Sequence, residues 1–382
     1  MQAANRAGRR VWLQRKHPLS RALIVSLAPC ISSPPALVPT AFFFLSFLRA
    51  LTALPAEAFA DKTILVTFNA LPKSLDEAPK LKWMHLLSAG SNHIQKHPIY
   101  TDSDITITTS SGIHGPQISE WVLMTTLVRT HFYNDLHDAQ KEHKWAKYAP
   151  SQTVHDLVGQ RLGVLGYGSI GRQVARVSQA MGMTVLAYTA TPKDTPAARR
   201  DHGFIVPGTG DPDGSIPSAW YSGLDRESLH QFLAQDVDIL LVSVPLTDQT
   251  RGFLGDDEFA VLSKGSASAA NGDGVKPWRD PAKGGKGPVL VNISRGQIVD
   301  QPALVRALEG GVLGGAALDV TDPEPLPADD PLWSAPNVTI TPHISGNGAS
   351  YVERSLQILE ENLARKESGD RLLNVVDRKR GY

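Results

Sequence analysis

The sequence predicts an α/β protein, a doubly wound parallel sheet accompanied by a second, smaller domain. Short β-branched runs alternate with helical patterns from Ala60 onward, which is typical of a parallel sheet with crossover helices. A glycine pattern, Gly166 to Gly171, stands between a predicted strand and a predicted helix. The length of 382 residues, 42% of them hydrophobic, is enough for two domains with separate cores.

The composition excludes several other classes of protein. The 38 basic residues balance 38 acidic ones, which argues against a nucleic-acid binder that is held by phosphate contacts. Cys30 is the single cysteine, so neither an internal disulfide nor a thiolate metal cage can form. These features predict an intracellular enzyme without a metal site.

The N-terminal segment, residues 1–51, departs from the rest of the chain. It is basic and contains no acid, and a charge-free stretch lies between Arg21 and Arg49. Such a segment is compatible with a signal peptide, a membrane anchor or a mitochondrial presequence. Four prolines interrupt the stretch, however, and a membrane span needs about 20 apolar residues. We therefore favour a strand over Ala22–Leu27, a buried helix over Ala41–Leu51 and a cytoplasmic location, with a mitochondrial one as the alternative.

The elements follow in order from residue 60. Three buried strands are expected in the first part, at 63–67, 83–87 and 104–109. A helix at Ile118–Phe132, apolar on nearly every face, should be covered by another domain or subunit. The predicted second sheet has strands at 161–165, 184–188, 238–244, 289–293, 315–318 and 338–341, and helices at 170–181, 227–234 and 302–309. A last helix, about Ser350 to Lys366, is free to return to the first domain.

Two long stretches are predicted to be loops. Thr191–Gly223 is rich in proline, glycine and aspartate, and Lys264–Pro288 is rich in glycine, alanine, serine and lysine. The second has the composition of an inserted surface loop, which either lies outside the fold or crowds the adenine side of a bound nucleotide.

The glycine pattern predicts a dinucleotide site. Gly166 permits a tight turn, Gly168 lets backbone amides approach a pyrophosphate, and Gly171 allows close packing of helix on strand. The helix that begins near Ser169 and Ile170 directs its positive end at the phosphates.

The next predicted strand bears on the choice between NAD and NADP. An acid that binds the ribose hydroxyls usually ends this strand, but here Thr189 occupies the position. Without that carboxylate a 2′-phosphate is not repelled, and Lys193, Arg199 or Arg200 can pair with one. NADP(H) is favoured slightly over NAD(H), although Thr189 would also tolerate either cofactor.

Three polar stretches follow predicted strands, where ligands bind in open α/β sheets. They are Asn292–Gly296, Asp319–Pro325 and Thr341–Gly346, and they contribute the guanidinium of Arg295, the carboxylate of Glu324 and the imidazole of His343. For any one group alone, an ordinary structural or surface role is the favoured explanation. Together, beside a nucleotide site, the three groups predict a catalytic site.

With these motifs in order, the sequence resembles the D-isomer-specific 2-hydroxyacid dehydrogenase family, closest to its glyoxylate/hydroxypyruvate reductase-like branch. The resemblance runs from about Thr52 to the C-terminus and rests on GYGSIG, NISRGQIVD, ALDVTDPEPLP and TPHISG, with SAGSNH and SSGIHG before them. It implies a Rossmann cofactor domain, residues 112–342, inserted in a smaller flavodoxin-like substrate domain made of residues 52–111 and 343–382. It also implies a homodimer. The charge balance predicts no nucleic-acid partner, and the interrupted apolar stretch disfavours a membrane association.

The resemblance further implies a role for each polar group. Arg295 would bind the carboxylate and keto oxygen of a small 2-keto acid, a task for which lysine is no substitute. His343 would donate the proton to the keto oxygen, and Glu324 would accept a hydrogen bond from the other ring nitrogen. Asp319 would bind the nicotinamide carboxamide.

The remaining residues of the expected site lie on loops. Backbone amides of Ser88, Ala89, Gly90 and Ser91 would form a nest for the substrate carboxylate, although without the resemblance an ordinary glycine turn explains them. The cofactor site would be lined by Gly166, Gly168, Ser169, Ile170, Gly171, Thr189, Lys193, Pro245, Thr250, Ile293, Arg295, Asp319, His343 and Gly346.

The expected activity is the NAD(P)H-dependent reduction of a small 2-keto acid to a 2-hydroxy acid. A formate dehydrogenase is disfavoured, because that branch carries Gln where Glu324 stands. Two alternatives stay open: a dinucleotide-sensing, peptide-binding protein similar to the C-terminal-binding corepressors, and a catalytically inactive homologue.

Overall fold

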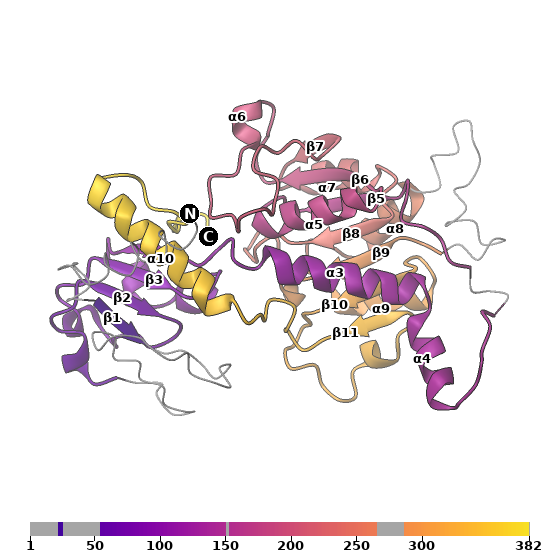
Figure 1. The fold of residues 1–382 in the computed structure, drawn as a ribbon, viewed down its shortest axis with the longest axis horizontal. Helices are drawn as coiled ribbons and strands as arrows, with labels where there is room; N and C mark the ends of the chain where they lie inside the picture. Colours follow the sequence, from indigo (N-terminus) through magenta and orange to yellow (C-terminus); the bar gives the residue numbers. More distant parts are fainter. Residues whose placement is uncertain (1–21, 26–53, 150–152, 266–285, 382) are drawn as a thin grey trace, which may run out of the picture. The chain divides into compact units, whose positions relative to one another are not determined.

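A computed structural model describes residues 22–25, 54–149, 153–265 and 286–381. The chain divides into two compact units (Figure 1). One contains the residues up to Ser111 together with Ala349–Tyr382, and the other is Gly112–Gly348.

The larger unit is built on a parallel sheet of seven strands in the order β11-β10-β9-β8-β5-β6-β7. This order reverses between β5 and β8, as in doubly wound dinucleotide-binding folds, and the predicted fold is confirmed. The strands are β5 (Arg161–Leu165), β6 (Thr184–Thr189), β7 (Ala219–Ser222), β8 (Ile239–Val242), β9 (Val289–Asn292), β10 (Gly315–Leu318) and β11 (Val338–Ile340).

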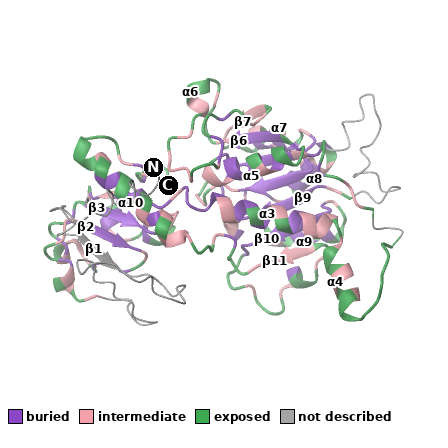
Figure 2. Ribbon diagram, viewed as in Figure 1, coloured by how far each residue is buried: buried purple, intermediate pink, exposed green. Residues whose placement is uncertain are grey.

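Helices cover both faces of this sheet, because successive strand residues point to opposite sides. Leu241 of β8 packs with α3 (Gly115–Thr130) and α5 (Ser169–Ala180) on one face. Its neighbour Leu240 packs on the other face with α7 (Arg226–Leu233), α8 (Asp256–Gly265) and α9 (Gln301–Glu309). Figure 2 shows the central strands as buried.

Capping residues fix where the helices begin. The Asp225 side chain accepts a hydrogen bond from the Ser228 amide at the start of α7, and Asp300 does the same for Ala303 in α9. Pro302 occupies the first turn of α9, where its missing N–H removes no hydrogen bond.

The smaller unit contains a parallel sheet with strands in sequential order, β1-β2-β3-β4. The helix α10 (Tyr351–Ser368) packs Leu359 and Leu363 against one face of it, so the C-terminal helix returns to this unit as predicted. The α/β character is confirmed, but the described residues show no strand-order reversal of the flavodoxin type. The strands are β1 (Ala22–Val25), β2 (Ile64–Thr67), β3 (Trp83–Leu86) and β4 (Thr106–Thr108), and α2 (Pro98–Thr101) precedes β4.

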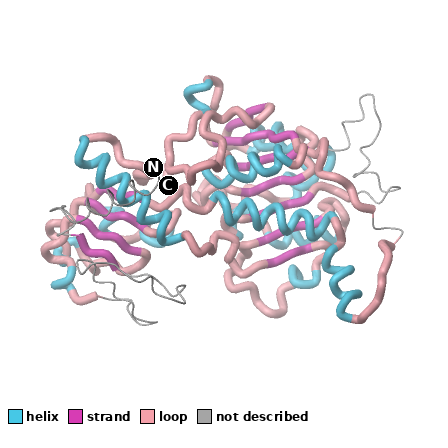
Figure 3. Tube along the Cα trace, viewed as in Figure 1, coloured by secondary structure: helices cyan, strands magenta, loops and turns pink. Residues whose placement is uncertain are grey.

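The structure corrects two of the predicted elements. The predicted loop Thr191–Gly223 contains α6 (Pro196–Arg199) and the edge strand β7, which pairs with β6 (Figure 3). The predicted helix Ile118–Phe132 ends earlier, at Thr130, because Phe132 adopts a left-handed backbone with φ of 52°. A separate helix, α4 (Tyr133–Lys141), follows.

The boundary between the units also differs from the prediction. The larger unit continues to Gly348 rather than ending at residue 342. The reason is that the amides of His343, Ile344 and Ser345 all donate hydrogen bonds to Asp319, which fastens this segment to the end of β10.

Several predictions fall on residues that the structure does not describe. They include the helix at 41–51 and most of the loop at 264–288, although α8 extends to Gly265. The predicted N-terminal strand is confirmed over Ala22–Val25. Among the described residues, no helix has the length and apolar character needed to cross a membrane.

Candidate active site

In the glycine turn between β5 and α5, two of the three glycines pack closely against neighbouring backbone atoms. Gly166 has φ of 104°, and a Cβ there would lie 2.7 Å from the backbone of Ser243 and Val244. At Gly171 a Cβ would lie 2.5 Å from the Gly166 carbonyl oxygen. Packing within the protein therefore accounts for glycine at these two positions.

Gly168 differs, because a Cβ at this position would meet no atom within 4 Å. It is the N-cap of α5, where the first backbone amides of the helix point outward. Packing within the protein does not require glycine here, whereas close approach of a phosphate does. Open space at the positive end of α5 fits the pyrophosphate of a dinucleotide.

A buried polar network holds the segment after α6 against the start of α5. Arg172 donates hydrogen bonds to the carbonyl oxygens of Asp211 (2.5 Å) and Arg199 (2.6 Å), and the Tyr167 hydroxyl donates to the Asp211 carboxylate (2.8 Å). Burial and the nearby Asp211 charge raise the pKa of Tyr167. No sequence motif marks Tyr167 and Arg172 as a pair, because their partners lie 27 to 44 residues away along the chain.

The end of β6 presents the residues expected to select the cofactor. The Thr189 hydroxyl donates to the Thr191 carbonyl oxygen (2.8 Å). Arg199 lies over the Trp220 ring, 5.7 Å from its centroid, and Arg200 pairs with Asp213 at 3.4 Å. Lys193 is half-buried, and within the described ranges its ammonium forms no ion pair. Of the three cations, Lys193 is therefore best placed to meet a phosphate.

The turn after β8 is held by Thr250, which is buried. Its hydroxyl donates to the Pro245 carbonyl oxygen (2.7 Å) and accepts from the Thr247 amide (2.8 Å). These bonds fix the turn, so any contact from it to the cofactor comes from other atoms.

Arg295 follows β9 on a loop that packs tightly against the loop after β10. A Cβ on Gly296 would lie 1.9 Å from the Thr321 carbonyl oxygen, so only glycine permits this approach. The Arg295 guanidinium donates to the Ser294 carbonyl oxygen (2.6 Å). Burial lowers the pKa of Arg295 and the Glu324 charge opposes that shift, so the guanidinium stays charged at neutral pH. Before this loop, Ile293 lies in the core.

Asp319, at the end of β10, organises the segment that carries His343. Its carboxylate is 1% exposed and accepts hydrogen bonds from the Thr341 hydroxyl (2.6 Å), the Ile344 amide (2.9 Å) and the amide (2.9 Å) and hydroxyl of Ser345. Its carbonyl oxygen accepts from the His343 amide at 2.8 Å. Because both carboxylate oxygens are engaged within the chain, the geometry favours a positioning role for Asp319.

His343 itself has a left-handed backbone with φ of 53°, a conformation that is uncommon for residues other than glycine. The hydrogen bonds to Asp319 hold it there. Strain of this kind recurs at functional sites, where surrounding contacts impose it. After His343, Gly346 accepts a hydrogen bond from Gln117 of α3 (3.0 Å).

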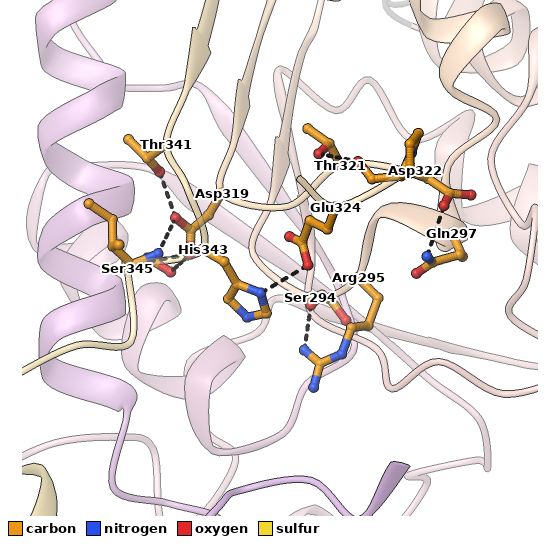
Figure 4. Close-up of polar contacts among 12 residues, drawn as sticks. Ser294, Arg295, Gln297, Asp319, Thr321, Asp322, Glu324, Thr341, His343 and Ser345 are labelled. Carbon is orange, nitrogen blue, oxygen red and sulfur yellow. Dashed lines mark hydrogen bonds and ion pairs between the residues drawn. The ribbon is translucent and has the colours of Figure 1, made fainter. Parts of the chain in front are cut away.

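Figure 4 shows the His343 ring directed toward Glu324, with Arg295 on the neighbouring loop. His343 Nδ1 lies 3.3 Å from Glu324 Oε2, and their side chains are 46% and 40% exposed. Because this contact uses Nδ1, it leaves Nε2 of His343 available to a substrate, and the exposure of both side chains makes them accessible to one. Glu324 and His343 thus contact each other at the carboxyl edge of the sheet, with Arg295 on the neighbouring loop. An imidazole, a carboxylate and a guanidinium in this arrangement are compatible with general acid–base chemistry.

The Ser88–Ser91 turn belongs to the smaller unit and directly follows β3. The Ser88 hydroxyl donates to the Gly90 carbonyl oxygen (2.8 Å), and Ser91 is buried. Three successive carbonyl oxygens at the start of the turn are held: Leu86 and Ser88 accept from Ser110, and Leu87 accepts from Tyr351. The turn therefore has a fixed backbone, with Ser88, Ala89 and Gly90 partly accessible.

A protein-family model matches the part of the chain that contains most of these loops. Residues 122–205 and 215–345 match the model of the D-isomer specific 2-hydroxyacid dehydrogenase, NAD binding domain. The matched region includes the glycine turn and the three catalytic candidates, and it omits residues 206–214 of the segment held by Arg172.

Sequence alignments with named relatives extend over most of the chain. A glyoxylate reductase of Korarchaeum cryptofilum is 26% identical over 304 residues, 79% of this chain and 78% of that protein. Glyoxylate/hydroxypyruvate reductase A of Salmonella paratyphi B is 27% identical over 309 residues, 79% of this chain and 82% of that protein.

Solved structures show the same fold. A probable 2-hydroxyacid dehydrogenase of Rhizobium etli in complex with NADP, HEPES and L(+)-tartaric acid superposes with a TM-score of 0.64 at 27% identity, covering 85% of this chain and 87% of that one. An NADPH-dependent glyoxylate/hydroxypyruvate reductase of Sinorhizobium meliloti in complex with NADP and sulfate gives 0.62 at 27% identity, covering 84% and 86%. The chain belongs to the D-isomer specific 2-hydroxyacid dehydrogenase family.

Proposed function

We propose that this protein reduces a small 2-keto acid, of the glyoxylate or hydroxypyruvate type, to the 2-hydroxy acid with NADPH. The observation that carries the proposal is the Glu324–His343 pair beside Arg295, on loops at the carboxyl edge of an NAD-binding domain. Relatives named glyoxylate and hydroxypyruvate reductases support the substrate class.

In this mechanism Arg295 binds the substrate carboxylate and keto oxygen with its planar fork of donors. His343 holds a proton on Nε2 and donates it to the keto oxygen as negative charge develops there. Glu324 accepts from Nδ1–H and keeps the ring in that orientation. The bound nicotinamide cofactor supplies the hydride. The backbone amides of Ser88–Gly90 are proposed to bind the substrate carboxylate.

The activity is tested by initial rates with a panel of 2-keto acids, with NADH and NADPH in parallel. We expect glyoxylate or hydroxypyruvate to drive NADPH oxidation. No oxidation with any 2-keto acid would overturn the assignment, and cofactor-dependent peptide binding without turnover would favour the corepressor-type alternative.

We propose that NADPH is preferred, because Thr189 removes the usual acid and Lys193 has no carboxylate partner within the described ranges. Solved relatives that contain NADP support this choice. Lys193→Ala should raise the KM for NADPH by about tenfold, as for one lost charged contact, and leave the KM for NADH unchanged. Arg200→Ala is the matched control, because Arg200 already pairs with Asp213; equal effects of both variants would contradict the assignment.

We also propose that the protein is a homodimer that associates through α3, α4 and the residues after them. Large apolar side chains are exposed here: Met124 is 51% exposed, Tyr133 54% and Trp145 99%. Such exposure is typical of a surface that another chain covers. Light scattering should give the mass of two chains, and the double substitution Met124→Glu and Tyr133→Glu should give one. A monomeric wild-type protein would refute the proposal.

A further inference from the structure

A polar cavity of about 300 Å³ lies at the amino ends of β9 and β11 in the larger unit, and its lining residue Arg129 packs against Gly315 at the amino end of β10. Arg129, Phe132, His155, Lys286 and Asn337 are among the residues that line it. The candidate catalytic groups follow the carboxyl ends of the same strands, so this cavity lies at the opposite edge of the sheet. It is independent of the proposed reaction.

The cavity contains a cation whose charge the described residues do not balance. Arg129 lies in the last turn of α3, and its Nε atom is buried without a hydrogen-bond partner in the part of the chain that the structure describes. No ion pair joins it to a carboxylate within those ranges. Burial lowers the pKa of Arg129 to about 10, so the group remains charged at neutral pH. Buried charges are normally paired, because desolvation without a partner is costly.

A second cation faces the same space. Lys286 donates to the Asn337 side-chain oxygen (3.1 Å) and lies 5.9 Å from the centroid of the Phe132 ring. Burial lowers the pKa of Lys286, and the charge of Arg129 lowers it further. The two cations therefore repel each other, and burial weakens the screening that water would provide.

Two carboxylates, Asp135 and Asp238, also line the cavity, and neither forms an ion pair with Arg129 within the described residues. Asp135 is exposed and raises the pKa of Lys286, and Asp238 uses one carboxylate oxygen to accept from the Arg161 amide (2.7 Å). The Nε2 atom of His155 is buried and has no hydrogen-bond partner in the described part of the chain. Arg129 and His155 are thus two lining residues with a buried nitrogen atom that has no hydrogen-bond partner in the described part of the chain.

We propose that this cavity binds a small oxyanion, phosphate or a small carboxylate, between Arg129 and Lys286. A guanidinium fork and an ammonium recognise such a group through charge-assisted hydrogen bonds. The cavity is at the lower end of the sizes of ligand pockets, which suits a small anion rather than a dinucleotide.

The test is thermal unfolding of the full chain, freed of nucleotide, in Tris chloride with or without 10 mM phosphate at matched ionic strength. A dissociation constant near 1 mM would raise Tm on the order of 3 °C. Arg129→Met should unfold at a higher temperature than the wild type without phosphate, because an unpaired cation is removed, and it should not respond to phosphate. Arg306→Met, which removes an exposed arginine paired with Asp256, should keep the response.

Other outcomes would overturn the proposal. One is a lack of response of the wild type to phosphate and to citrate. Another is an Arg129→Met protein that is less stable than the wild type without phosphate yet responds to it equally. A third outcome combines two results: the wild type shows no phosphate effect, and Arg129→Met is a monomer where the wild type is a dimer. This outcome would identify the partner of Arg129 as a side chain of a second copy of the chain. If Arg129→Met fails to fold, calorimetric titration of Lys286→Met with phosphate decides, and wild-type affinity would contradict the site.

Discussion

Substitution of Gly168 by alanine separates cofactor binding from folding. Gly168 has φ of −88° and ψ of −164°, which alanine adopts without strain, and the added Cβ would meet no protein atom within 4 Å. The stability of the apo protein should therefore stay the same or rise by up to about 1 kcal/mol, because alanine restricts the unfolded chain. The methyl group would instead occupy the space that a pyrophosphate needs.

The loss of cofactor affinity can be estimated from the contacts at stake. A hydrogen bond to a charged group contributes about 1.5–3 kcal/mol, so loss of one backbone amide contact should weaken NADPH binding by roughly tenfold to a hundredfold. Gly171→Ala is the matched control. Its Cβ would lie 2.5 Å from the Gly166 carbonyl oxygen, and overpacking of this kind costs about 1–3 kcal/mol of stability.

The assay combines thermal unfolding of both apo variants with NADPH titration followed by fluorescence. We expect Gly168→Ala to keep its Tm and to lose affinity, and Gly171→Ala to lose several degrees. Wild-type affinity in a folded Gly168→Ala protein would refute the placement of the pyrophosphate at the start of α5.

The remaining predictions concern the support of the active site. Asp319→Asn puts an amide group opposite hydrogen-bond donors such as the Ile344 and Ser345 amides, so the His343 segment should lose its support. We expect kcat to fall at least about tenfold with the NADPH dissociation constant unchanged. A change in cofactor affinity alone would instead indicate that Asp319 binds the nicotinamide. Burial lowers the pKa of His85 from 6.5 to about 4, so the folded protein keeps this ring neutral where the unfolded chain would protonate it. The free energy of unfolding should therefore be unaffected by His85 above pH 6.5 and should fall by up to about 3 kcal/mol as the pH drops toward 4. Denaturant unfolding at pH 7 and 4.5 should show a weaker pH dependence in His85→Gln than in the wild type, and equal dependence would exclude His85 as the cause. Tyr351→Phe frees the Leu87 carbonyl oxygen before the Ser88 turn, and it should raise the KM for the keto acid severalfold with little change in kcat. Tyr100→Phe is the control, because it loses a longer hydroxyl hydrogen bond in the same unit, and it should change neither parameter. Identical KM values in both variants would argue against a positioning role for Tyr351.

The sequence predicted the parts of the site that depend on local geometry. The glycine turn was recognised because a strand, a turn and a helix succeed one another within Arg161–Ala180. Arg295, Glu324 and His343 were recognised because parallel strands bring their carboxyl ends to one edge of the sheet, so residues that follow different strands become neighbours.

The parts that were missed depend on tertiary contacts. The strand β7 has four residues and pairs with β6 at the edge of the sheet. Its aromatic pair, Trp220 and Tyr221, is too short a run to stand out from the proline-, glycine- and aspartate-rich residues before it. The role of Asp319 comes from hydrogen bonds to residues 22 to 26 positions away. The helix α8 is an exception: it was not predicted, although three acids at its start precede the buried Phe259 and Leu262, which is a local helix signal.

The proposed function depends on transfer of a proton from His343 to the keto acid during reduction. The most direct measurement is the steady-state rate of NADPH oxidation at saturating glyoxylate in the wild type and in His343→Asn. Asparagine tolerates the left-handed backbone of this residue better than alanine but does not replace the imidazole. We expect kcat to fall by on the order of 10²-fold or more with the NADPH dissociation constant within about threefold; a kcat near the wild-type value would contradict the account.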